Sequence, residues 1–93
     1  MNETTTMKLM IVIVRDTDDV DVLQALVKQG YRVTRVASTG GFLHHGNVTL
    51  MIGVEAEQVD SVIETLRQVC RPAEGSEHRA TILVVNMPHF EQI

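Results

Sequence analysis

Apolar residues recur along this chain in four short runs and two helical stripes. The runs cover residues 8–14, 31–38, 47–54 and 80–85, and their aliphatic and β-branched side chains are typical of strands. Two stripes with near-helical spacing lie between the runs: Val20, Leu23, Ala25, Leu26 and Val27, then Val59, Val62, Ile63, Leu66, Val69 and Cys70. The predicted order is therefore strand, helix, strand, strand, helix, strand.

This order is that of the ferredoxin-like βαββαβ unit, so we expect an α+β fold. Its four strands form one antiparallel sheet, and both helices pack on one face. The acids at residues 16–19 supply N-cap chemistry for the first helix, and Gly30 ends it. Residues 71–77 have the composition of a loop, and residues 86–93 form a tail. Residues 1–6 are expected to be a flexible leader, and residues 7–93 a single domain.

The second face of the predicted sheet needs cover. A chain of 93 residues makes one small core, and a monomer with a bare apolar sheet face would be sticky. We therefore expect a symmetric oligomer in which the sheets of neighbouring subunits face one another.

Charge and composition exclude several classes of protein. The formal net charge of −4 argues against DNA or RNA binding, which needs a basic face. The chain has no apolar run near the length of a membrane span, about 20 residues. Cys70 is the single cysteine, so no internal disulfide can form, which fits a reducing cytoplasm.

The stretch over residues 32–47 holds the strongest candidate chemistry. It enters as a strand and then reaches Gly40 and Gly41, followed by Phe42 and Leu43. Large apolar side chains are unusual at a turn tip. An apolar wall, free backbone amides and neighbouring donors suit a flat, anionic, heteroaromatic ligand. The alternative is a glycine-rich hairpin whose hydrophobic tip packs against a neighbouring subunit.

Other polar clusters favour structural interpretations. His44 and His45 are adjacent, so on an extended segment they point to opposite sides, and a metal site is the minority interpretation. An acidic Mg²⁺ site at residues 16–21 is less favoured than helix capping and dipole compensation. Cys70 is expected to be a buried small hydrophobe at a helix end. No paired nucleophile and base, P-loop or glycine-serine elbow is present, so we predict that the chain is not an enzyme.

From Met7 onward, the sequence resembles the PII-like cyclic-di-AMP receptor family of bacteria. The matching stretches read M-K-L-M-I-V-I-V-R-D, R-V-T-R-V-A-S-T-G-G-F-L, G-N-V-T-L-M-I-G-V-E and F-E-Q-I. The resemblance implies a cytoplasmic signal-transduction protein and a homotrimer of ferredoxin-like subunits. One cyclic dinucleotide would bind in each of three clefts between subunits, and a downstream protein, not identified by the sequence, would receive the signal.

The resemblance also implies a set of ligand-binding residues. They are Arg32, Thr34, Gly41, Phe42, Leu43, Asn47, Gly53 and Gln92. It implies no cofactor beyond the ligand cyclic di-AMP, no metal and no membrane partner. Two alternatives remain: a sensor of another adenine nucleotide such as ATP, ADP or AMP, and a structural or interaction trimer without a ligand.

The chain departs from the family at two single positions, in one adjacent pair and in one loop. Gly30 stands where relatives often have Asn, Leu83 where they have an aromatic residue, and His44-His45 replaces a basic and a small residue. Relatives carry a long loop between the second helix and the last strand, whereas residues 71–79 are all that remains here.

Overall fold

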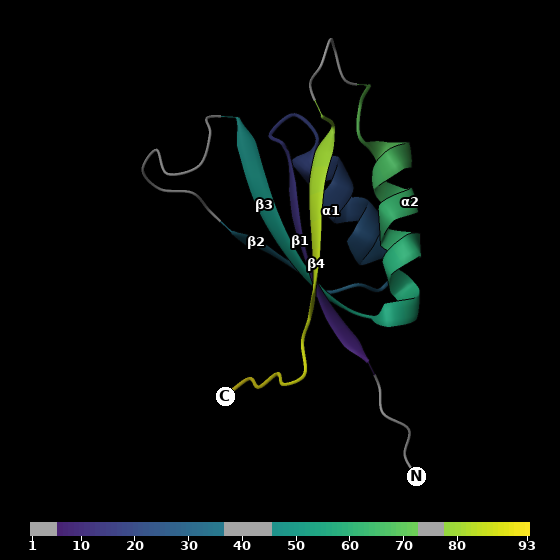
Figure 1. Ribbon diagram of the computed structural model, residues 1–93. Coiled ribbons are helices and arrows are strands. Elements are labelled where there is room, and N and C mark those ends of the chain that lie inside the picture. Colours follow the sequence, from purple (N-terminus) through teal and green to yellow (C-terminus); the bar gives the residue numbers. More distant parts are fainter. Residues whose placement is uncertain (1–5, 37–45, 73–77) are drawn as a thin grey trace.

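The fold has the predicted order of elements (Figure 1). The computed structural model describes residues 6–36, 46–72 and 78–93. Its elements are β1 (Met7–Arg15), α1 (Asp19–Lys28), β2 (Val33–Val36), β3 (Asn47–Glu55), a 3₁₀ turn (Ala56–Gln58), α2 (Val59–Val69) and β4 (Ala80–Asn86). The ferredoxin-like α+β prediction is confirmed.

The strands form one antiparallel sheet in the order β2-β3-β1-β4. β1 is central and pairs with both long neighbours, so that Met10 lies opposite Ile52 of β3 and Val84 of β4. Both helices cover the same face of this sheet, and the start of β1 lies beside the end of β4 (Figure 1). β2 and β4 are therefore the two edge strands.

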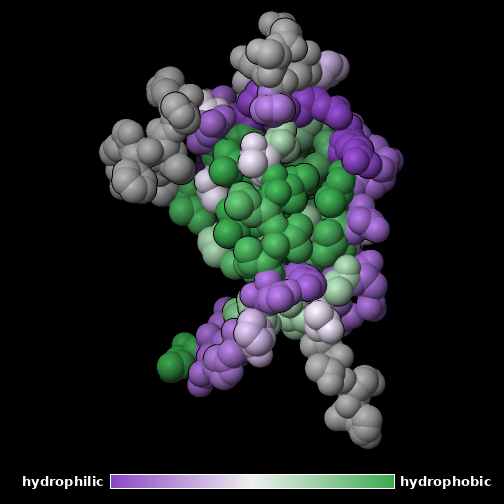
Figure 2. Space-filling view, viewed as in Figure 1, coloured by the Kyte–Doolittle hydropathy of each residue, from purple (hydrophilic) through white to green (hydrophobic). Residues whose placement is uncertain are grey.

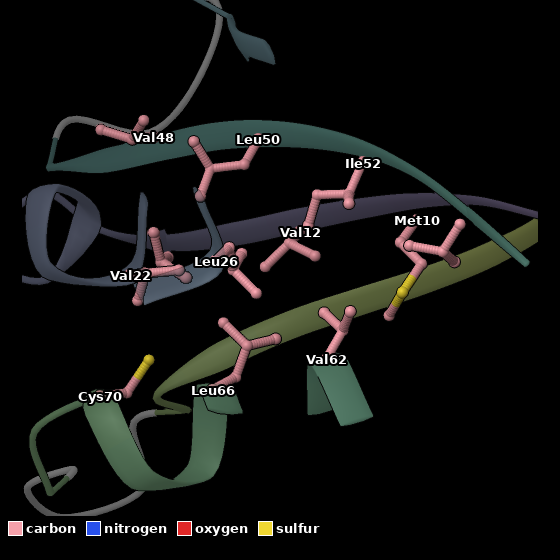
Figure 3. Close-up of a cluster of buried hydrophobic side chains, with 12 residues drawn as sticks. Met10, Val12, Val22, Leu26, Val48, Leu50, Ile52, Val62, Leu66 and Cys70 are labelled. Atoms are coloured by element: carbon pink, nitrogen blue, oxygen red, sulfur yellow. The ribbon is translucent and has the colours of Figure 1, made fainter. Parts of the chain in front are cut away.

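Strict alternation along β1 and β3 builds the core between the sheet and the helices. Every second residue of these strands is buried: Met10, Val12 and Val14 on β1, and Val48, Leu50, Ile52 and Val54 on β3. These side chains point toward Val22 and Leu26 of α1 and toward Val62 and Leu66 of α2 (Figure 3). Cys70 completes the cluster directly after α2, with 5% of its surface exposed, as predicted.

The residues between these buried positions form the helix-free face of the sheet. On β1 this face carries Leu9, Ile11 and Ile13, and all three are half-buried. On β4 it carries Leu83 and Val85, which are 46% and 42% exposed. Figure 2 shows hydrophobic side chains gathered over β4 and the strands beside it, next to a polar surface over α2. A single chain leaves this apolar surface uncovered.

One boundary differs from the sequence prediction, and one short turn was not predicted. The strand expected over residues 31–38 begins only at Val33, because the Tyr31 N–H donates to the Leu26 carbonyl at 3.1 Å and stays with the end of α1. Residues 37–38 lie outside the described part of the chain, as do residues 1–5 of the expected leader. The second helix is preceded by the 3₁₀ turn, where the Gln58 Oε1 accepts from the Glu55 N–H at 2.9 Å.

Leu50→Ala should lower the free energy of unfolding by about 2–5 kcal/mol, because it opens a cavity at a fully buried position of β3. Chemical denaturation at one protein concentration measures this change. Val27→Ala, at a position 54% exposed on α1, is the matched control and should change stability by no more than about 0.5 kcal/mol. Equal effects of the two substitutions would contradict the core described here.

Candidate functional site

Five of the eight predicted ligand-binding residues lie within the described part of the chain. They are Arg32, Thr34, Asn47, Gly53 and Gln92. Gly41, Phe42 and Leu43 lie outside the described residues, and so do His44 and His45. The geometry of the site is therefore that of the strands flanking residues 37–45 and of the C-terminal tail.

Arg32, Thr34 and Gly53 come together at one end of the β2–β3 pair. Thr34 lies opposite Met51, whose neighbours Leu50 and Ile52 are buried in the core, so Thr34 belongs to the helix-free face. Arg32 directly precedes β2, whose first residue, Val33, lies opposite Ile52, the residue before Gly53. All three residues are exposed. The spacing of two residues between Arg32 and Thr34 predicts that both lie on one face, and the register places Thr34 on the helix-free face.

Asn47 lies at the other end of β3. It is the first residue of that strand and pairs with Arg15 of β1. Asn47 and Gly53 are an even number of residues apart, so they share the helix-free face, but six steps along a strand separate them by about 20 Å. Asn47 lines a hollow of about 460 Å³ together with Arg15, Thr17, His78 and Thr81.

Gly53 leaves room above the sheet because it has no side chain. It does not have a special backbone geometry. Its φ is not positive, unlike that of Gly30 and Gly46. A Cβ at position 53 would meet the Met87 Cε at 3.4 Å, which is an ordinary contact. The open surface at Gly53 is therefore compatible with the close approach of a ligand.

The tail leaves the sheet beside Gly53. The Met87 N–H donates to the Met7 carbonyl at 3.0 Å, which holds the tail to β1 at its first residue. Beyond this bond, Phe90 is 65% exposed and Gln92 is also exposed. Met87 and Phe90 line a second hollow, of about 620 Å³, at this end of the sheet. Gln92 thus extends from the end that carries Arg32 and Gly53, not from the end that carries Asn47.

The prediction of an N-cap role for the acids at residues 16–19 is wrong for the residue at the cap position. Asp18 occupies that position, but its side chain makes no capping hydrogen bond. Its Oδ2 accepts from the Arg15 Nε and Nη2 at 3.1 and 2.9 Å. Asp19 begins α1, and its Oδ2 accepts from the Arg35 Nε at 2.8 Å. The two carboxylates are therefore ion-pair anchors.

Sequence reasoning missed these anchors because, apart from Arg15, their partners are distant in the chain. Arg35 is 16 residues from Asp19, and the Arg71 N–H that reaches the Asp18 Oδ1 is 53 residues away. The sequence signal for these ion pairs was four aspartates within residues 16–21. The start of a helix shows the same pattern, so the signal did not distinguish the two roles.

Cys70 is not poised for chemistry. Burial raises the pKa of its thiol, and the nearby Asp18 carboxylate raises that pKa further. The thiol therefore stays protonated at neutral pH and packs as an apolar group. Among residues 6–36, 46–72 and 78–93, no three His, Cys, Asp or Glu side chains are grouped so that they could hold a metal ion. No helix in this part of the chain is long and apolar enough to cross a membrane.

Known proteins resemble this chain in both sequence and fold. The sequence model of the family described as "Cyclic-di-AMP receptor" matches residues 7–90. A protein of unknown function from Pediococcus pentosaceus is 33% identical over 97% of this chain and 100% of its own, with a TM-score of 0.78. PII from Arabidopsis thaliana, solved with citrate, is 30% identical over 89% of this chain and 78% of its own, with a TM-score of 0.72.

A more distant structure supports the same fold. GlnK from B. subtilis, solved as a complex with ATP, is 20% identical over 94% of this chain and 86% of its own, with a TM-score of 0.69. The family match covers both helices, all four strands and the positions of seven of the eight predicted ligand-binding residues, Gln92 being the exception. The chain therefore belongs to the cyclic-di-AMP receptor family, a group of non-catalytic signalling proteins with the PII-like fold.

Proposed function

We propose that this chain is a cytoplasmic receptor for the second messenger cyclic di-AMP and that it binds the ligand in clefts between the subunits of a homotrimer. The family to which the chain belongs supports the choice of ligand. The observation that carries the proposal is the common orientation of the predicted contact residues. Thr34, Asn47 and Gly53 belong to the helix-free face, which one chain leaves open, and Arg32 directly precedes β2.

The spacing of these residues supports a site shared by two subunits. Asn47 lies about 20 Å along β3 from Gly53, so one chain presents two half-sites at opposite ends of its sheet. A ligand held between neighbouring subunits can contact the Asn47 end of one chain and the Arg32 end of the next. The apolar side chains between these ends, such as Ile11 and Leu83, gain cover from the same contact.

Each predicted residue has a chemical role in this proposal. Phe42 and Leu43 pack against an adenine ring, and the Gly41 backbone amide and Arg32 hold phosphate. Thr34 and Asn47 orient the ligand by hydrogen bonds, whose loss with a wrong base would leave buried groups unpaired. Gly53 permits close approach, and Gln92 of the tail closes over the ligand.

Titration by calorimetry with cyclic di-AMP, ATP, ADP and AMP tests the ligand. We expect cyclic di-AMP to bind most tightly. Arg32→Ala should weaken its binding by about 2–5 kcal/mol, because a desolvated phosphate would lose its charge partner. Arg32→Lys should recover part of this loss, since a single ammonium cannot make the two-pronged contact of a guanidinium.

Arg67→Ala on α2 is the control for the loss of a positive charge, and it should leave the affinity unchanged. Arg67 is 66% exposed and belongs to the opposite layer of the molecule. Tighter binding of ATP, ADP or AMP would replace cyclic di-AMP by that nucleotide. No binding of any of the four would leave a structural or interaction trimer.

Light scattering at micromolar concentration should give the mass of a trimer with and without nucleotide. Leu83→Glu should shift the mass toward the monomer, because it would bury an unpaired carboxylate in the contact between sheets. Val27→Glu, at an exposed position on α1, should leave the trimer intact. A wild-type monomer would contradict both the assembly and the shared site.

A further inference from the structure

The turn between β1 and α1 buries two carboxylates close to the surface of a small protein. We call residues 15–19 the aspartate turn. Asp18 and Asp19 are only 1% and 3% exposed. Aspartate is almost never buried to this extent unless it is paired. Each carboxylate therefore depends on its partners, and those partners come from three different parts of the chain.

The aspartate turn makes two groups of contacts, which we call its arms. The first arm holds the residues on both sides of residues 37–45. Arg35 on β2 donates from its Nε to the Asp19 Oδ2 at 2.8 Å. The Asp16 N–H donates to the Gly46 carbonyl at 2.6 Å. Arg35 lies two positions before this segment and Gly46 directly after it. The entry to the segment and its exit are thus fastened to the same turn.

A second arm holds the segment that follows α2. The Arg15 Nη1 donates to the Pro72 carbonyl at 3.5 Å, and its Nη2 donates to the Arg71 carbonyl. The Asp18 Oδ1 accepts from the Arg71 N–H at 3.5 Å, and the Arg71 Nε lies 3.8 Å from it. Pro72 directly precedes residues 73–77. The shortened loop of this chain is therefore fastened to the aspartate turn at its first residues.

We infer that Asp18 and Asp19 are positioning residues which couple the nucleotide-binding segment to the loop after α2. This inference rests on the proposed function, because that function gives residues 37–45 their ligand. Consecutive carboxylates in one short turn cannot move independently. A buried carboxylate that loses its cation is left uncompensated, so the turn rearranges and its other contacts change with it. A change at Arg35 is thereby transmitted to Arg71, which Arg35 does not touch.

Arg35→Gln tests the coupling, with Arg35→Lys as the conservative variant. Arg67→Gln is the matched control, because it removes an exposed ion pair with Glu64 at 3.7 Å that has no part in the aspartate turn. Two measurements are made on each protein: hydrogen exchange without ligand, and calorimetric titration with cyclic di-AMP. The reporter amides are those of Asp16 and Arg71, which donate to the Gly46 carbonyl and to Asp18.

We expect Arg35→Gln to speed exchange at both reporter amides and to weaken cyclic di-AMP binding about tenfold, within the range for residues of one ion-pair network. Arg35→Lys should restore part of both properties because it keeps the charge. Arg67→Gln should change neither. Asp19→Asn combined with Arg35→Gln should weaken binding no further than either change alone, since both remove the same ion pair.

Two results would overturn the inference. If Arg35→Gln leaves both reporter amides and the affinity at wild-type values, the Asp19–Arg35 pair couples nothing. If Arg35→Gln speeds exchange at the Asp16 amide and leaves the Arg71 amide at its wild-type rate, the two arms are independent. If the wild-type protein fails to bind cyclic di-AMP, the proposed function fails, and the exchange of the Asp16 and Arg71 amides alone decides whether the arms are coupled.

Discussion

The alternation of side chains along β1 and β3 is the constraint on which the rest of this structure depends. One row of these central strands, which includes Met10 and Leu50, is fully buried under α1 and α2. The intervening row cannot reach the helices and must face the other way. On β1 this second row is aliphatic as well, with Leu9, Ile11 and Ile13, so one strand contributes both to the core and to the apolar part of the helix-free face. A shift of one residue in register would exchange the two surfaces.

The hydrophobic pattern predicted best the elements whose own sequence shows which of their residues are buried. β1, β3 and α2 carry a complete apolar row or stripe, and their predicted ranges differ from the observed bounds by a few residues at most. β2 was overpredicted, because the β-branched residues near Val33 indicate a strand but not where it begins to pair. The tertiary contact of Tyr31 with the end of α1 sets that boundary, and local sequence does not contain it.

The candidate site was predictable to a different degree at each residue. An even spacing along one strand is enough to predict that Arg32 and Thr34 share a face, whereas the common face of Asn47 and Gly53 follows from the observed register of β3. The identity of the ligand came from the family resemblance and not from geometry. The role of Asp19 was not predictable in this way, because a helix start explains an acid without invoking Arg35. Only the fold brings β2 beside the first turn of α1.

Asp19 gains its importance from the weakness of β2. This strand has four residues and lies at the sheet edge, where it pairs with β3 on one side. Short edge strands gain little from sheet hydrogen bonds alone and need another attachment. The ion pair from Arg35 to Asp19 supplies one, to the helix layer instead of the sheet. It acts one residue before Val36, where β2 ends and the chain continues into residues 37–45. The strand that leads into the proposed nucleotide-binding segment is therefore held from two layers of the fold. For this reason, a carboxylate on the helix side can influence the proposed site on the helix-free face.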